Sequence, residues 1–123
     1  MTELNLTDEN FDEVLQSAEK PVLVDFWAQG CMPCVILTPI LEKVAKDYQD
    51  KLIFAKANLD AVPNIAQKLG VDRVPMVMLF KEGKPVSGFV GVRPESVVRE
   101  ILDKMLADNF GLEKAIREYQ EYA

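Results

Sequence analysis

The chain has 123 residues, a length that fits one domain with a buried core. Hydrophobic residues make up 49% and charged residues 28%, as in ordinary soluble globular proteins. The formal net charge is −6 and no cluster of Lys or Arg is present, which argues against nucleic-acid binding. No apolar run approaches the roughly 20 residues of a membrane span, and the N-terminus lacks a secretory signal pattern. We therefore expect a cytoplasmic protein that binds neither nucleic acid nor membranes.

Strand-like and helix-like segments alternate along the chain. Residues 4–6 form a short candidate strand, and Thr7 or Asp8 caps a helix that runs to Ser17. The remaining candidates follow in chain order: a strand at 22–27, a helix at 33–48, a strand at 52–58, a helix at 64–69, a hairpin of strands at 77–80 and 85–90, and a helix from Pro94. The order βαβαβαββα predicts an α/β fold in which helices cover both faces of a mixed sheet.

The motif Cys31-Met32-Pro33-Cys34 contains both cysteines of the chain. If Cys34 begins a helix, both sulfur atoms lie at the helix N-terminus, where unsatisfied N–H groups and the helix dipole favour a thiolate. A second thiol within bonding reach can close an intramolecular disulfide, so the motif predicts a dithiol–disulfide exchange site. The chain has no histidine, which excludes Cys–His catalysis and leaves proton transfer to carboxylates, Lys, Cys or water.

Four other residues are candidates for a role beside the cysteines, and each also has a structural interpretation. Asp25 interrupts an apolar strand. It is either a buried acid with a raised pKa, or a carboxylate at a strand edge or paired with a lysine. Lys56 interrupts the next strand and either pairs with Asp25 or faces solvent. Pro75 opens the hairpin as either a trans break or a cis proline. Trp27 is either a core residue or the floor of a docking surface.

Three segments form a recognisable set: Asp25-Phe26-Trp27-Ala28-Gln29-Gly30-Cys31-Met32-Pro33-Cys34, Val74-Pro75 and Phe89-Val90-Gly91. This set resembles the thioredoxin family, and the resemblance runs from about residue 3 to about residue 107. It implies a five-stranded mixed sheet flanked by four helices. It also implies a protein-disulfide oxidoreductase that exchanges dithiols and disulfides with protein substrates. The redox group implied is the cysteine pair itself, without a cofactor, and the electron donor implied is of the thioredoxin-reductase type.

The resemblance also implies a role for each matching residue. Cys31 is the nucleophile that attacks a substrate disulfide, and Cys34 is the resolving thiol that releases the reduced substrate. Asp25 assists proton transfer at Cys34, and Lys56 tunes it. The substrate-docking groove, whose backbone pairs with the substrate as an added strand, comprises Trp27, Met32, Pro33, Val74, Pro75 in the cis form, Met76 and Gly91.

Three positions beside the cysteines depart from the family pattern. The family usually has Trp where this chain has Gly30, Gly where it has Met32, and Lys where it has Val35. The missing cation at position 35 removes one electrostatic aid to the thiolate. Because Gly30 and Met32 flank the docking groove, we expect a changed partner preference, including a non-standard electron donor.

The chain continues beyond residue 107, where the last helix of the thioredoxin domain should end. We therefore divide it into a domain at 1–107 and a C-terminal extension at 108–123 that is not a separate domain. Leu112, Ile116 and Tyr119 lie at i, i+4 and i+7 and predict one short amphipathic helix. An isolated helix this short is marginal in water. It packs either on its own chain or on a partner or second copy, so the chain is expected to be a monomer or a weak homodimer.

Two other functions are alternatives at this point. A binding module or co-chaperone on the same scaffold would dock through the C-terminal helix, but such proteins often lack one or both of the cysteines that this chain keeps. A metal site is disfavoured because two cysteines supply only half of the usual four-ligand zinc shell and no histidine completes it. We therefore expect no metal.

Overall fold

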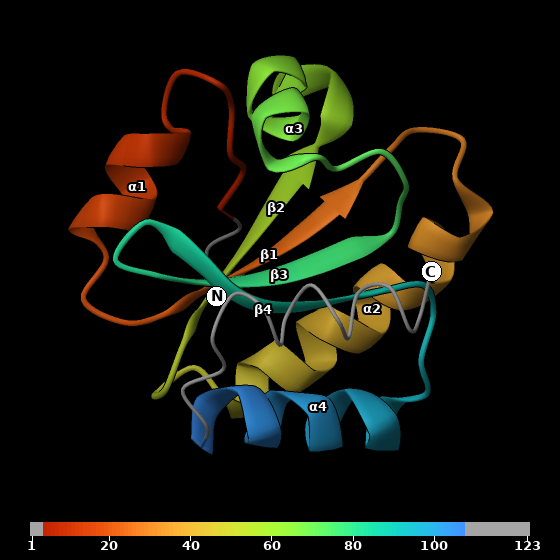
Figure 1. The fold of residues 1–123 in the computed structure, drawn as a ribbon. Helices are drawn as coiled ribbons and strands as arrows, with labels where there is room; N and C mark the ends of the chain where they lie inside the picture. Colours follow the sequence, from red (N-terminus) through yellow and green to blue (C-terminus); the bar gives the residue numbers. More distant parts are fainter. Residues whose placement is uncertain (1–3, 108–123) are drawn as a thin grey trace.

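The computed structural model describes residues 4–107, in which one sheet separates two pairs of helices (Figure 1). The elements in chain order are α1 (Phe11–Ser17), β1 (Val22–Trp27), α2 (Met32–Asp47), β2 (Ile53–Asn58), the short 3-10 helix η1 (Leu59–Ala61), α3 (Pro63–Leu69), β3 (Met76–Lys81), β4 (Lys84–Val90) and α4 (Glu95–Ala107). From β1 onward the predicted order of helices and strands is confirmed, and each predicted boundary agrees with the structure to within one residue.

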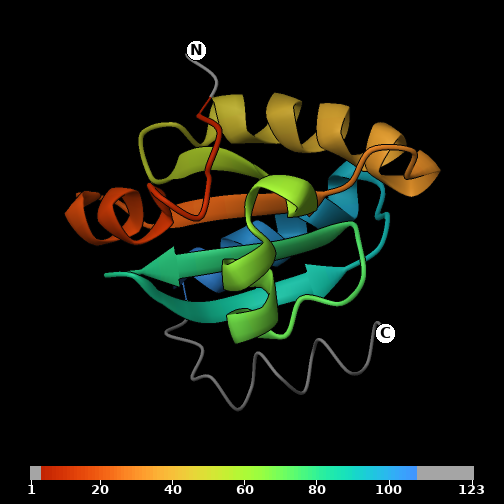
Figure 2. The same ribbon diagram turned by 90° about the horizontal axis from the view of Figure 1, so that it is seen from above.

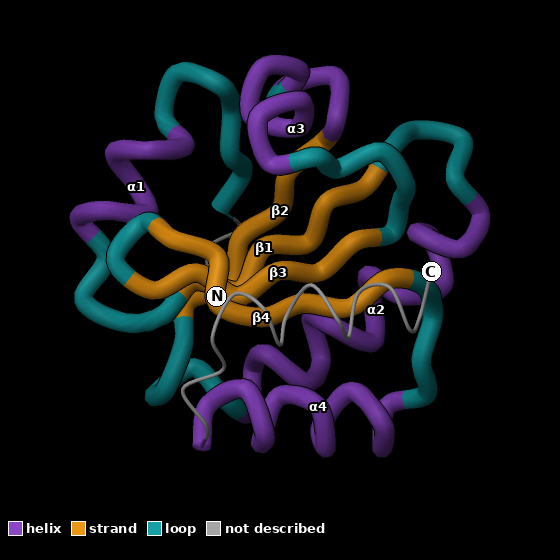
Figure 3. The backbone as a smooth tube through the Cα atoms, viewed as in Figure 1, coloured by secondary structure: helices purple, strands orange, loops and turns teal. Residues whose placement is uncertain are grey.

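The sheet is mixed, as predicted, and its strands lie side by side in the order β2-β1-β3-β4 (Figure 3). β1 pairs with β2 in parallel, whereas β1 with β3 and β3 with β4 are antiparallel. The C-terminal end of β1 therefore lies beside the N-terminal end of β3 and the C-terminal end of β4. The loop that leads from β1 to α2 and the loop that precedes β3 consequently meet at one end of the sheet.

The prediction of a fifth strand at residues 4–6 is wrong for the described part of the chain, because Asn5 makes only an isolated parallel bridge to Lys56. Two backbone bonds hold this segment, Leu6 N to Lys56 O and Lys56 N to Leu4 O, both 2.8 Å. The chain then turns away, because the Thr7 amide donates to Asn10 Oδ1 and the Asn10 amide donates to Thr7 Oγ1. This turn also explains why the first helix begins at Phe11 rather than directly after Thr7.

Each face of the sheet has its own hydrophobic core, because side chains alternate along each strand. In β1, Val22, Val24 and Phe26 face the core beneath α1 and α3, whereas Leu23 faces the core beneath α2 and α4. Figure 1 shows α1 and α3 on one side of the strands and α2 and α4 on the other. In Figure 2, seen from above, α3 lies in front of the strands and α4 lies behind them. Asp25 follows the same alternation and therefore lies on the α2 side of the sheet.

No helix within residues 4–107 is long and apolar enough to cross a membrane. The predicted helix at 108–123, and with it the proposed division at residue 107, lies outside the described residues.

Candidate active site

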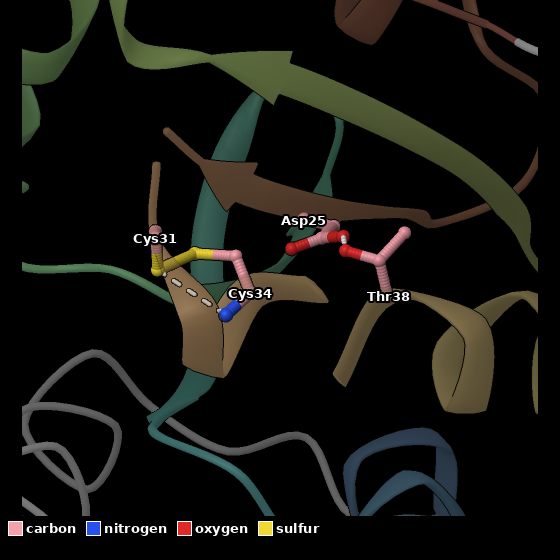
Figure 4. Close-up of a disulfide and its surroundings, with 4 residues drawn as sticks. All are labelled: Asp25, Cys31, Cys34 and Thr38. Atoms are coloured by element: carbon pink, nitrogen blue, oxygen red, sulfur yellow. Dashed lines mark hydrogen bonds between the residues drawn. A yellow bond between two sulfur atoms is a disulfide. The ribbon is translucent and has the colours of Figure 1, made fainter. Parts of the chain in front are cut away.

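The two cysteines form a disulfide at the N-terminus of α2 (Figure 4). Cys31 is the N-cap residue, with φ −89° and ψ 104°, and its Sγ accepts a hydrogen bond from the Cys34 amide at 3.2 Å. Pro33 lies in the first turn, where its missing N–H breaks no helical bond. Both sulfur atoms therefore lie where the first amides of the helix favour negative charge.

The two sulfur-bearing residues differ in exposure. Cys34 is 3% exposed, because it lies on the inward side of α2 together with Leu37 and Leu41. Cys31 lies before the helix proper and is only half-buried. A second protein can therefore reach Cys31 far more easily than Cys34.

Asp25 is fully buried and lies against α2. The Thr38 hydroxyl donates to Asp25 Oδ2 at 2.7 Å (Figure 4), while Oδ1 receives no hydrogen bond within residues 4–107. Burial raises the pKa of Asp25 to about 6, and this effect outweighs the lowering by the Thr38 hydroxyl and the Lys56 ammonium. Of the two sequence-based interpretations of Asp25, the structure has the buried acid with a raised pKa.

Lys56 lies directly opposite Asp25 in the parallel β1–β2 register. Its Nζ is 5.8 Å from the centre of the Trp27 ring, at a distance suited to a cation–π contact. Of the two sequence-based interpretations of Lys56, the structure favours the one that links it to Asp25. Its charge lowers the pKa of Asp25, and its side chain is half-buried against an aromatic ring.

A hollow of about 360 Å³ opens between the β1–α2 loop and the first turns of α2. Cys34 and Thr38 both line this hollow, and Thr38 is the hydrogen-bond partner of Asp25. The other residues that line it are Trp27, Ala28, Gln29, Gly30, Val35, Pro39 and Lys56. The hollow therefore gives solvent a route toward the buried thiol and the residue that holds the buried acid.

The predicted groove residues at the start of β3 lie at the same end of the sheet. The Val74–Pro75 bond is cis, the form that the resemblance implied. Phe26, next to Trp27, is opposite Met76, and the Gly91 amide donates to the Pro75 carbonyl at 2.9 Å. Backbone register thus brings the loop before β3 and the end of β4 next to the end of β1.

The side chains of the predicted groove residues are not equally accessible. Met32 is 68% exposed and Pro33 is also exposed, whereas Trp27 is half-buried. Met76 is only 6% exposed and packs in the core beneath α1 and α3, so it offers a partner its backbone rather than its thioether.

Sequence reasoning missed Thr38. It lies four residues after Cys34, on the same face of a helix, and is a polar residue next to an inward-facing leucine. That spacing was the available signal, but only the packing of α2 on β1 shows that the hydroxyl meets a carboxylate.

The family model for thioredoxin matches residues 2–104. The chain belongs to the thioredoxin family. It is 43% identical over 106 residues to the thioredoxin of Staphylococcus haemolyticus, an alignment that covers 86% of this chain and all of the relative. It is 42% identical over 105 residues to the thioredoxin of Alicyclobacillus acidocaldarius, with 85% and 95% covered. It is 38% identical over 101 residues to the M-type chloroplastic thioredoxin of Chlamydomonas reinhardtii, with 82% and 72% covered.

This membership and the Cys31–Cys34 pair make the protein a thiol–disulfide oxidoreductase that works by dithiol–disulfide exchange. Like other thioredoxins, it acts on disulfide substrates, receives electrons from a reductase, and uses no redox group besides its own cysteine pair. Within residues 4–107, no three His, Cys, Asp or Glu side chains gather in a way that suits a metal ion.

Proposed function

We propose that this protein reduces protein disulfides, with Cys31 as the attacking thiolate and Cys34 as the resolving thiol. The observation that carries this assignment is the difference in exposure between a half-buried N-cap cysteine and a cysteine that is 3% exposed. An attacking sulfur must reach the disulfide of another protein, whereas a resolving sulfur needs to reach only its neighbour. Cys31 suits the first task and Cys34 the second.

Two exchange steps complete the reaction. The Cys31 thiolate attacks one sulfur of the substrate disulfide, a mixed disulfide forms, and the other substrate sulfur leaves as a thiolate. Cys34 then loses its proton and attacks Cys31, so the Cys31–Cys34 bond forms as the mixed disulfide breaks. The substrate leaves with two thiols after protonation, and this protein has lost two electrons, which a reductase returns.

Asp25 is proposed to accept the Cys34 proton in the second step, through water. Thr38, which lies one helical turn after Cys34, donates to the Asp25 carboxylate, and the hollow lined by Cys34 and Thr38 gives water access. Because the pKa of Asp25 is about 6, the carboxyl is mostly ionised at neutral pH and can act as a base near that pH. Lys56, whose charge lowers this pKa, is the proposed tuning residue.

Trapping the mixed disulfide tests the two cysteine roles. A Cys34→Ser variant should accumulate a covalent complex with a disulfide protein such as insulin, because the resolving thiol is missing. A Cys31→Ser variant, which keeps one cysteine as the matched control, should trap little. The reverse pattern, with the Cys31→Ser variant forming the complex, would overturn the assignment.

The direction of electron flow is tested by the reduction potential of the pair, measured against a glutathione or dithiothreitol series. A potential at or below that of the cytosolic glutathione pool agrees with a reductase. A much more oxidising potential would show that the protein donates disulfides instead.

We also propose a cytoplasmic location, because disulfide reduction suits a compartment that keeps thiols reduced. Cell fractionation that found the protein in an organelle would contradict it.

The remaining proposals concern partners. Gly30, Met32 and Val35 flank the exchange site, so a standard thioredoxin reductase is expected to recycle this protein poorly. Normal turnover with such a reductase would contradict that expectation.

We also propose that the protein is a monomer or a weak homodimer. Each chain would consist of a domain at 1–107 and a C-terminal extension at 108–123. Sedimentation of the full chain tests its oligomeric state.

A further inference from the structure

The solvent-facing side of α2 changes character along its length. Its exposed residues in the first half are all apolar, and those in the second half are all charged. Met32, Val35 and Ile36 are 68%, 63% and 54% exposed and are the large hydrophobic side chains most open to solvent within residues 4–107. We name these three residues the α2 ridge. The helix therefore exposes apolar surface at the end that carries the disulfide and charges at the other end.

The α2 ridge forms one continuous strip. Met32, Val35 and Ile36 lie at i, i+3 and i+4, so their side chains are neighbours on one helix face. No charged residue occurs from Phe26 to Leu41, so no charge from the loop or the first half of the helix interrupts the strip. The core beneath α2 is filled from the opposite side of the helix, by Leu37 and other residues. The ridge thus contributes nothing evident to the packing of this domain.

The shape beside the ridge suits an apolar side chain from outside. Val35 and Pro39 line the helix side of the hollow of about 360 Å³, and Trp27 and Gly30 line its loop side. Because Gly30 has no side chain, the loop side is open where the thioredoxin family usually has an aromatic ring. A projecting side chain of a partner can therefore enter the hollow while its neighbours cover the ridge.

The ridge is also continuous with the exchange site. The mixed disulfide joins a partner sulfur to Cys31 by a bond of about 2 Å. The partner backbone beside that sulfur must then lie close to Met32, the next residue in the chain. Contiguous exposed apolar surface is a common mark of a protein–protein contact, and here it adjoins a point that every partner reaches.

We propose that the α2 ridge is a docking surface for the substrate protein that exchanges its disulfide with Cys31, and that it selects substrates with an apolar side chain near the reacting cysteine. This inference rests on the proposed function as a disulfide reductase. Val35 and Ile36 thereby act as specificity-determining residues, since they touch the substrate chain beside the reacting sulfur and take no part in the exchange of electrons.

Two disulfide peptides of equal length test the proposal, one with Leu and one with Ser on each side of a reacting cysteine. The reduced full-length protein should reduce the Leu peptide with the higher kcat/KM. A double variant, Val35→Gln with Ile36→Gln, replaces apolar by neutral polar side chains at exposed helical positions. Its kcat/KM for the Leu peptide should fall about tenfold, mainly through KM, because two partly buried apolar contacts are lost. Its kcat/KM for the Ser peptide should change far less.

The ratio of the two kcat/KM values is the decisive readout. A change in folding or in the reactivity of Cys31 would slow both peptides alike and leave this ratio unchanged. Lys46→Gln, on the charged half of the same helix, is the matched control and should keep the ratio of the unaltered protein. An equal ratio in the double variant and the unaltered protein would overturn the inference. If the unaltered protein reduced neither peptide nor glutathione disulfide, the proposed function itself would fail.

Discussion

Asp25 shows how strongly the surroundings of one residue alter its chemistry. Its carboxyl is fully buried and one of its oxygens accepts the Thr38 hydroxyl. Folding raises its pKa from 3.8 to about 6, chiefly because burial penalises the charged form. Burying an ionisable carboxyl costs folding free energy, and proteins accept this cost at functional sites, where a base that titrates near neutral pH is useful.

The stability of the oxidised protein should depend on pH through Asp25. Between pH 4 and pH 6 the native state holds a proton that the unfolded chain releases, so the free energy of unfolding falls as pH rises through this window. The linkage amounts to about 2 kcal/mol between pH 4 and pH 7. In an Asp25→Asn variant the side chain at position 25 cannot titrate, so this pH dependence should be lost. The difference in unfolding free energy between the variant and the unaltered protein should therefore shift in favour of the variant as pH rises from 4 to 7. Urea unfolding at several pH values measures it, and parallel stability curves for the two proteins would contradict it.

Val35 stands where the family usually has a lysine. A Val35→Lys variant should stabilise the neighbouring Cys31 thiolate, so that iodoacetamide alkylates the reduced protein about two- to fivefold faster at neutral pH. Val35→Gln separates charge from shape and should leave the rate near that of the unaltered protein. High salt should remove most of the gain, because the added ammonium is exposed. A gain of the same size in the glutamine variant would show that charge is not its cause.

At the scale of single elements, α3 depends on a residue far away in the sequence. This helix has only seven residues, and its N-cap position, Val62, makes no side-chain capping bond. Asp8 caps it instead, because its two carboxylate oxygens accept the amides of Asn64 and Ile65 at 3.1 and 3.0 Å. The negative charge also complements the helix dipole. Asp8 therefore ties the segment before α1 to α3.

Removing this cap should destabilise the protein measurably. An Asp8→Ala variant should lose about 1–2 kcal/mol of unfolding free energy, since two helix amides lose their acceptor. Asp8→Asn, which keeps one acceptor oxygen, should recover part of the loss. Glu9→Ala changes an exposed neighbour and should be close to neutral. Urea unfolding compares the three variants, and an Asp8→Ala variant as stable as Glu9→Ala would exclude this capping role.

At the scale of the whole molecule, the two cores share one sheet. The core beneath α1 and α3 contains Leu15, and the core beneath α2 and α4 contains Leu41; both side chains are almost fully buried. Each strand contributes residues to both cores, so neither core can persist when the sheet is lost. The described domain should therefore unfold as one cooperative unit.

A mutation in one core should move the unfolding of the other. Leu15→Ala should cost about 2–5 kcal/mol, the range for leucine deletions in packed cores. Trp27 is the single tryptophan and lies at the end of β1 beside α2. Its fluorescence transition should shift together with the circular dichroism transition of the whole chain. Glu13→Ala, on the exposed side of α1, is the control. Separate fluorescence and dichroism midpoints in the Leu15→Ala variant would reveal independent cores.

The sequence by itself determined the order of elements and the location of the chemistry. Periodicities of two and 3.6 residues depend on local burial, so they predicted β1 to α4 to within one residue. The CxxC motif fixed the redox pair, because two cysteines three positions apart at a helix start need no distant residue to form their bond. The same local rules gave a strand at residues 4–6, where the Thr7–Asn10 turn allows only one bridge.

Only the tertiary structure decided what surrounds that pair. The pKa of Asp25 depends on the packing of α2 over β1, and Thr38 comes to its carboxylate from 13 residues away. The burial of Cys34 beside a half-buried Cys31 follows from the way α2 lies on the sheet. The exposure of the α2 ridge follows from it as well, since an apolar strip on a helix is typical of a core until packing shows which side faces solvent. Long-range contacts set these properties, and no local pattern in the chain records them.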